Sequence, residues 1–262
     1  ANQPTVFKTY PGLDTVSLAE PEEPLPDVFL SKLIRHEFVP EAKAELTFPQ
    51  LSRIIGLAHR VTAKARHGAG YFYYRNVASA GALYPFELYV AAKAGSGLDD
   101  GLYHHTLGLG ALTRLRAGDM TAVLADGLQT KERLSWTAVF FLTSIFFRSA
   151  WKYRNRAYRY HLLDTGHLAE SLLLALAACG LSARWYVDFD DDKINALLGV
   201  DPTKEVCLAV AVVEGEELPS QTHPRVLSVS VSGSADASRV STHEADFGLI
   251  RQAHASSSPI VR

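Results

Sequence analysis

Apolar residues recur at helical spacing in two long segments of the chain. In the first, residues 47–64 (TFPQLSRIIGLAHRVTAK), apolar positions follow one another every three or four residues, which predicts a helix. Thr47 and Gln50 have the spacing of a capping box and mark where this helix begins. The second segment, residues 160–180, predicts the longest helix, and Gly180 stands where a C-terminal glycine cap belongs. Apolar residues go almost all the way round this second helix, which favours a central, buried position.

Runs of β-branched and aromatic residues between turn residues predict strands in the middle of the chain. One run, residues 101–116, is broken by the turn-like sequence LGLG and predicts a hairpin. The glycines of this turn do not form a dinucleotide-binding fingerprint, because no third glycine stands at the required place and the flanks resemble strands. The other predicted strands are residues 86–95, 137–147 and 205–215.

Weaker helical patterns occupy three further segments, residues 27–38, 119–136 and 190–199. The last of these has acids at its beginning and a glycine at its end, as the helix dipole and C-terminal capping favour. Together, the elements predict one α+β domain in which about four or five strands surround a buried helix.

The two ends of the chain differ in amino-acid composition from the predicted domain at residues 27–215. Residues 1–26 contain five prolines and several acids, which predicts an extended N-terminal arm. Residues 216–262 are rich in serine, which favours a mobile or partner-wrapping tail, or a linker, with one short helical patch around residues 245–253.

Composition narrows the class of protein. The 262 residues are 47% hydrophobic and 21% charged, which is typical of a globular enzyme or binding domain. The net charge of -2 argues against a general nucleic-acid-binding protein, which needs a basic excess. Cys179 and Cys207 lie in apolar surroundings, too far apart in sequence for a metal knuckle. Because no run is long enough to span a membrane and the first residues lack a signal-peptide core, the expected location is the cytoplasm.

The segment WKYRNRAYRYH, residues 151–161, concentrates unusual chemistry. It places four cations among three tyrosines, a tryptophan and a histidine. Either the cations face water over a layer of aromatic rings, or they converge on an anionic ligand. At the edge of a pocket, Lys152 and Tyr153 could also move protons, because burial lowers the pKa of an ammonium group. A lysine that merely reaches into water is the alternative.

A metal site on the long predicted helix is one alternative. Its candidate ligands are His161, Asp164, His167 and Glu170. Ligands three residues apart each turn roughly 60° further round a helix, so these four spiral off one face. Local hydrogen bonds or packing are therefore expected for the histidines, and no metal is expected. The chain also has neither a GxSxG nucleophile elbow nor a GxxxxGK phosphate loop.

A second informative segment is RNVASAGALYPFELYV, residues 75–90. Its run of small residues, Ala78–Gly81, permits the backbone to approach a phosphate or a flat ring closely. A tight turn at the start of a strand explains the same residues equally well.

In order along the chain, the motifs SAGALYP, GLYHH, KYRNRAYRYHLLDTGH and DFDD…INALLG resemble the nitroreductase superfamily. The resemblance extends over most of residues 27–215 and is strongest to the azoline-oxidising, SagB-type dehydrogenases. It implies an α+β fold, with a mainly antiparallel sheet wrapped by helices and with extended N- and C-terminal arms. It also implies an FMN-dependent homodimer that holds the flavin at the subunit interface and oxidises thiazoline or oxazoline rings in a modified peptide.

The same resemblance suggests roles for individual residues. The catalytic lysine–tyrosine pair falls on Lys152 and Tyr153, either of which could act as the base. The remaining positions are implied to contact the cofactor, through small residues, guanidinium groups or the backbone: Arg35, Arg75, Ser79, Ala80, Gly81, Arg156, Arg159, Val187 and Asp188.

Several positions depart from the family pattern and leave alternatives open. The usual phosphate-binding arginines of the first helix are reduced to Arg35 and His36, and Val187 and Asp188 replace a glycine pair near the flavin. A general NAD(P)H-dependent nitroreductase or quinone reductase is one alternative. A catalytically silent module that dimerises or binds peptide is the other. The segment EADFGLIRQAHAS, residues 244–256, also resembles the linker of relatives that carry two such domains in one chain.

Overall fold

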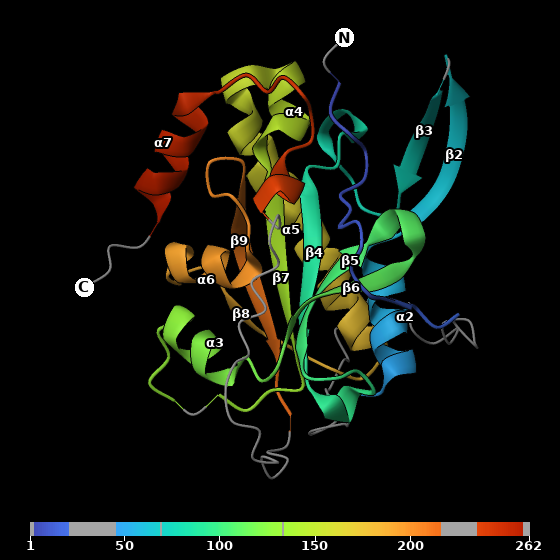
Figure 1. Ribbon diagram of the computed structural model, residues 1–262, viewed down its shortest axis with the longest axis vertical. Coiled ribbons are helices and arrows are strands. Elements are labelled where there is room, and N and C mark those ends of the chain that lie inside the picture. Colours follow the sequence, from blue (N-terminus) through green and yellow to red (C-terminus); the bar gives the residue numbers. More distant parts are fainter. Residues whose placement is uncertain (1–2, 21–45, 69, 133, 216–234, 259–262) are drawn as a thin grey trace, which may run out of the picture.

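The computed structural model describes residues 3–20, 46–68, 70–132, 134–215 and 235–258. A seven-stranded sheet forms its centre, with the strand order β1-β6-β5-β4-β7-β9-β8 (Figure 1). Every strand pairing in this sheet is antiparallel. The strands are β1 (Thr15–Ser17), β4 (Phe86–Ala92), β5 (Gly101–Thr106), β6 (Ala111–Ala117), β7 (Ala138–Ile145), β8 (Arg184–Tyr186) and β9 (Glu205–Val213). The predicted strands and hairpin are thus confirmed, while the short edge strands β1 and β8 were missed.

Helices cover both faces of the sheet, so the predicted α+β class is confirmed. On one face, α2 (Phe48–Ala58) and α5 (Ala157–Ala178) pack over alternate residues of β4 and β7, including Leu88, Val90 and Phe140. On the other face, α3 (Thr121–Gly127) and α6 (Asp191–Leu198) pack over the intervening residues of the same strands. The period of two along a strand produces these two hydrophobic cores.

Helix α2 begins as the sequence predicts but ends earlier. Thr47 and Gln50 form the expected capping box at its N-terminus. The helix stops at Ala58, and residues predicted to continue it form β2 (Val61–His67), which pairs with β3 (Gly70–Arg75) as a separate hairpin. The end of the predicted helix, residues 61–64, instead pairs with the aromatic strand β3. This pairing involves residues further along the chain and overrides the helical spacing of the apolar positions.

The segment that follows β7 also differs from its prediction. The strand ends at Ile145 rather than Phe147, and the chain continues directly as α4 (Phe146–Tyr153). Helix α5 then begins at Ala157 and is followed by Gly180, which has the left-handed φ of 73° expected for a C-terminal cap.

Helix α5 is buried on one side only, which corrects the expectation of a fully buried central helix. Leu168 and Leu172 are buried in the core, whereas Leu162, Leu163 and Leu173 are 47%, 61% and 44% exposed. The apolar residues on its outer side therefore remain exposed in the described part of the chain. Among the described residues, no helix has both the length and the apolar character needed to cross a bilayer.

Segments from both ends of the chain meet on the sheet. Lys8 is buried and forms an ion pair with Glu205 at the start of β9. The backbone N–H of Thr5 donates to the carbonyl of Val240 at 2.7 Å. The helical patch expected near the C-terminus forms α7 (Gly248–Ser257), which packs against α5 through Tyr158. The helix predicted at residues 27–38 lies outside the described residues.

Candidate active site

A strained loop follows β3 and leads into β4. Gly81 has a φ of 65°, and the non-glycine residues Ala82 and Tyr84 also have positive φ values of 52° and 48°. Left-handed backbone costs a non-glycine residue roughly 1–2 kcal/mol, and such strain gathers at functional sites. The surrounding structure must therefore hold this loop in place.

Asp164 of α5 is the residue that holds the loop. Its carboxylate accepts hydrogen bonds from the Ser79 hydroxyl at 2.6 Å and from the Ala80 backbone N–H at 3.1 Å. Ser79 in turn accepts a hydrogen bond from the Tyr84 N–H at 2.8 Å. Burial raises the pKa of Asp164 above its usual value, although the hydrogen bonds from Ser79 and Ala80 act in the opposite direction.

The end of α4 faces this loop. A Cβ atom on Gly81 would lie 2.5 Å from the Tyr153 hydroxyl and 3.0 Å from the Lys152 Nζ. Tyr153 is held by the Tyr160 ring, whose centroid is 4.6 Å away. The structure thus brings Ser79, Ala80 and Gly81 together with Lys152 and Tyr153, as the resemblance implied for a shared site.

The chain changes direction sharply after Tyr153. Arg154, with φ 51° and ψ -138°, ends α4, and a short turn leads into α5. Lys152, Arg154, Arg156 and Arg159 are all exposed at this junction. In the part of the chain that the structure describes, none of these four cations pairs with a carboxylate, although Arg156 donates to the Tyr160 hydroxyl at 3.2 Å. The basic aromatic run therefore presents four exposed cations without a carboxylate partner among the described residues, and Lys152 is the one that lies next to Gly81.

Arg75 lies inside the protein rather than on this cationic surface. Its guanidinium donates to the Val6 carbonyl at 2.9 Å and lies 4.7 Å from the centre of the Tyr84 ring. Burial and the nearby Arg148 lower its pKa to about 9. These contacts place it beneath the loop, where it connects the N-terminal segment to Tyr84.

Val187 lies on the opposite side of α5 from Asp164, and Asp188 follows it in the chain. Val187 is 77% exposed and lines a cavity of about 500 Å³ together with Leu162, Gly166 and Ala169 of α5. At 100° per residue, those helix positions point away from Asp164. The loop residues Ser79, Ala80 and Gly81 do not line this cavity. Arg35 lies outside the described residues.

One residue that lines the cavity beside Val187 has a polar atom without a hydrogen-bond partner in the structure. The hydroxyl of Thr165 is buried and makes no hydrogen bond, although Thr165 lines the cavity. A buried, unsatisfied hydroxyl costs about 1–3 kcal/mol.

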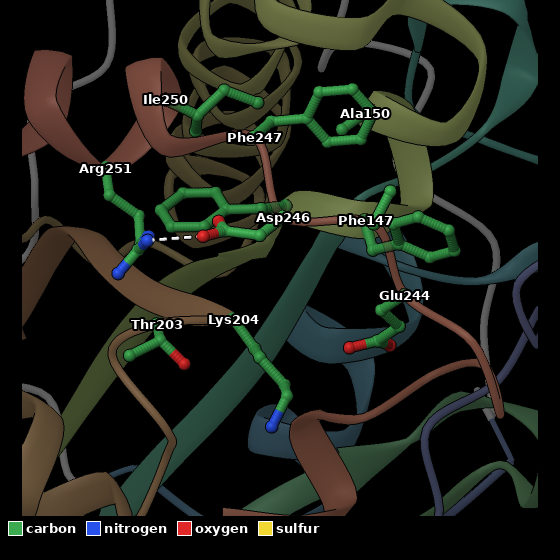
Figure 2. Close-up of a pocket in the computed structure, with 11 residues that line it drawn as sticks. Phe147, Ala150, Thr203, Lys204, Glu244, Asp246, Phe247, Ile250 and Arg251 are labelled. Atoms are coloured by element: carbon green, nitrogen blue, oxygen red, sulfur yellow. Dashed lines mark hydrogen bonds and ion pairs between the residues drawn. The ribbon is translucent and has the colours of Figure 1, made fainter.

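Another cavity, of about 300 Å³, is lined by residues of α4 and of the C-terminal segment. Figure 2 shows Phe147, Ala150, Phe247 and Ile250 among the residues that line it. Its charged groups are already satisfied: Arg251 pairs with Asp246 at 2.5 Å, Lys204 with Asp201 at 2.7 Å, and Glu244 accepts two backbone N–H groups. This cavity therefore offers no free charge for a ligand.

Sequence reasoning missed the loop-holding role of Asp164 and considered this residue only as a metal ligand. A usable signal exists: Asp164 lies on the same helical stripe as His161, Leu168 and Leu172, all of which are buried. A carboxylate on a buried stripe needs hydrogen-bond donors from elsewhere. No group of three potential metal ligands occurs among the residues that the structure describes.

Comparison with known proteins assigns the fold to a family. The sequence profile of the nitroreductase family matches residues 41–215. A Methanocaldococcus jannaschii protein named as a nitroreductase is 25% identical over 191 residues, which cover 71% of this chain and 91% of that protein.

Solved structures agree with this match. A structure from Anabaena variabilis, described as a nitroreductase, is 25% identical, covers 99% of this chain and has a TM-score of 0.74. This chain spans only 50% of that structure's length. A chain of the E. coli microcin synthetase McbBCD complex, solved with truncated pro-MccB17 bound, shares the fold at 17% identity and a TM-score of 0.58, with 80% of this chain and 77% of that chain covered. Because the profile matches most of its length, this protein belongs to the nitroreductase family, whose members are oxidoreductases that typically bind a flavin.

Proposed function

We propose that this protein is an FMN-dependent oxidoreductase that dehydrogenates azoline-type rings in a peptide or peptide-like substrate. The observation that carries the proposal is the convergence of Lys152 Nζ and Tyr153 Oη on the backbone of Gly81. Two groups that can move protons thus meet a loop with no side chain at its closest point.

The residues present fit FMN on three counts. Gly81 lets the Tyr153 hydroxyl and the Lys152 ammonium lie against the loop backbone, where a Cβ would collide with Tyr153. The exposed guanidinium groups of Arg156 and Arg159 have no carboxylate partner among the described residues and suit a phosphate. Thr165 lines the cavity beside Val187 and has a buried hydroxyl without a hydrogen-bond partner. An anionic cofactor with a flat aromatic system matches this set of groups.

Conversion of an azoline to an azole removes two electrons and two hydrogens from the ring. When bound, FMN supplies a two-electron acceptor for the hydride. The chain must take the remaining ring proton, and Lys152 and Tyr153 are the groups positioned to hold it. Asp164 maintains the loop opposite them through Ser79 and Ala80.

The site is completed, in this proposal, by a second copy of the chain. Loop 79–81 and Val187 lie on different sides of α5, although both are implied to contact one cofactor. Leu162, Leu163 and Leu173 leave an uncovered apolar surface on the outer side of the same helix. A homodimer that covers this surface would bring Val187 of one copy to the loop of the other.

The first test is a visible absorption spectrum of the purified protein, taken before and after incubation with FMN and gel filtration. We expect flavin bands that co-elute with a dimer. A colourless dimer that does not retain FMN would favour the catalytically silent module and overturn the proposed function.

The second test separates azoline oxidation from general reduction. We expect Lys152→Ala and Tyr153→Phe to abolish azole formation from a thiazoline-containing peptide while leaving NADPH-dependent menadione reduction nearly unchanged. Lys131→Ala, an exposed lysine in the segment after α3, is the matched control. An equal loss of both activities would contradict the assigned base role, and menadione reduction without any azole formation would favour the general reductase.

A further inference from the structure

The β2–β3 hairpin is an exposed projection beside the site. Figure 1 shows it as a separate arm, away from the seven-stranded sheet. All the residues from Thr62 to Arg66 on β2 are exposed. Two-stranded hairpins are marginally stable alone, so an exposed one on an otherwise packed domain points to a role other than core formation.

The register of the hairpin sorts its side chains into two different faces. Lys64 lies opposite Tyr73, and Arg66 lies opposite Tyr71, so these four residues share one face. The other face carries Ala63 and Ala65 with Phe72 and Tyr74. We call the first of these the cationic face.

The cationic face carries positive charge that the protein does not neutralise. From residue 59 to residue 86 the sequence contains no aspartate or glutamate. No carboxylate among the described residues pairs with Lys64 or Arg66. The Lys64 ammonium lies 5.3 Å from the centre of the Tyr71 ring, and Tyr71 is 56% exposed. On a chain with a net charge of -2, this is a local concentration of cations and aromatic rings.

The base of the hairpin is fixed next to the active-site loop. Asn76 accepts a hydrogen bond from the Arg60 N–H at 2.8 Å and donates to the Leu57 carbonyl at 2.5 Å, which ties both strands to the end of α2. Arg75 is buried, and only three residues separate it from Ser79. The base of the hairpin is therefore close to loop 79–81 along the chain.

We propose that the cationic face binds an acidic segment of the peptide that carries the heterocycle. The peptide nature of the partner rests on the proposed function, whereas its charge rests on Lys64 and Arg66 alone. Residues two apart on a strand are separated by roughly 6.5–7 Å, so Lys64 and Arg66 match carboxylates at alternate positions of an extended peptide. Two exposed cations are too few for a nucleic-acid surface, which neutralises many phosphates.

The test measures binding and turnover separately. Fluorescence anisotropy follows a labelled ten-residue peptide with glutamates at alternate positions, compared with its glutamine counterpart and with oligo-dT of equal length. We expect Lys64→Glu and Arg66→Glu each to weaken binding of the glutamate peptide about three- to five-fold, as for exposed ion pairs, and added salt to weaken binding by the wild-type protein. Lys131→Glu, a matched reversal in the segment after α3, should leave binding unchanged.

Turnover then decides whether this binding serves the reaction. With a thiazoline peptide flanked by alternating glutamates, both hairpin variants should raise KM without changing kcat, and the glutamine-flanked peptide should show no difference. If no azole formed while the glutamate peptide still bound, the proposed function would be overturned and the hairpin proposal would stand. The hairpin proposal would be overturned if wild type and variants bound the glutamate peptide equally, or if oligo-dT bound more tightly than the peptide. It would also be overturned if the variants changed only the oligomeric state.

Discussion

The Tyr153 hydroxyl lies 2.5 Å from the point that a Cβ atom on Gly81 would occupy, although 72 positions separate the two residues. The contact joins the end of α4 to the loop before β4. It requires glycine at position 81 for two reasons, the missing side chain and the φ of 65°.

Gly110 makes it possible to separate these two reasons. It has a similar φ of 59°, but no atom lies within 4 Å of its hypothetical Cβ. We expect Gly81→Ala and Gly110→Ala each to lose about 1–2 kcal/mol of unfolding free energy from backbone strain. Only Gly81→Ala should also lower FMN affinity and azoline turnover. Urea unfolding and FMN titration measure the two effects, and equal FMN affinity in both variants would argue against contact between the loop and the cofactor.

The raised pKa of Asp164 predicts a pH-dependent stability term. Burial makes the folded carboxyl bind its proton more tightly than the unfolded one, so its contribution to stability falls as pH rises from 3.8 through the folded pKa. Asp164→Asn removes this titration. We therefore expect the unfolding free energy of wild type minus that of the variant to decrease as the pH rises above 3.8. A difference that does not vary with pH would show that Asp164 keeps an ordinary pKa.

The Lys8–Glu205 ion pair fixes the N-terminal segment to β9. Burial by itself would raise the pKa of Glu205, but the Lys8 ammonium and the hydrogen bonds from Lys8 and Thr143 outweigh it, so the net pKa is lowered. We expect Lys8→Met to cost about 3–5 kcal/mol, because a buried carboxylate is left unpaired. Adding Glu205→Gln should recover part of this loss, since the amide carries no charge.

An exposed ion pair provides the control for this prediction. Arg251 and Asp246 lie at the surface, and Arg251→Met should cost less than about 1 kcal/mol. Thermal or urea unfolding compares the variants. If Lys8→Met cost as little as Arg251→Met, the buried pair would not anchor the N-terminal segment.

His161 should make the protein sensitive to mild acid. It is fully buried and hydrogen-bonded to the Ser144 hydroxyl at 2.8 Å, and burial lowers its pKa from 6.5 to about 3. The unfolded chain therefore gains a proton that the folded chain resists, and stability falls as pH drops below 6.5. The slope for this group approaches about 1.4 kcal/mol per pH unit. His161→Gln should flatten the pH dependence of urea unfolding by this amount, and an unchanged slope would contradict a neutral buried imidazole.

Local patterns in the sequence determined most of the secondary structure. The capping box of Thr47 and Gln50, the cap at Gly180 and the β-branched runs of β4, β7 and β9 all depend on neighbours close in sequence, so they can be recognised without a fold. Lys152, Tyr153 and the small loop at Gly81 were linked as one predicted site by their resemblance to the nitroreductase superfamily.

Only the tertiary structure decided how those pieces meet. Pairing of β2 with β3 replaced the expected end of a helix, and packing on one side of α5 left Leu162 and Leu163 exposed. Asp164 became the support of the Ser79 loop through contacts across 85 positions of sequence. Side-chain direction and long-range contacts depend on where the chain returns in space, and the loop-closure and burial energies that fix this are properties of the whole fold rather than of any window of sequence.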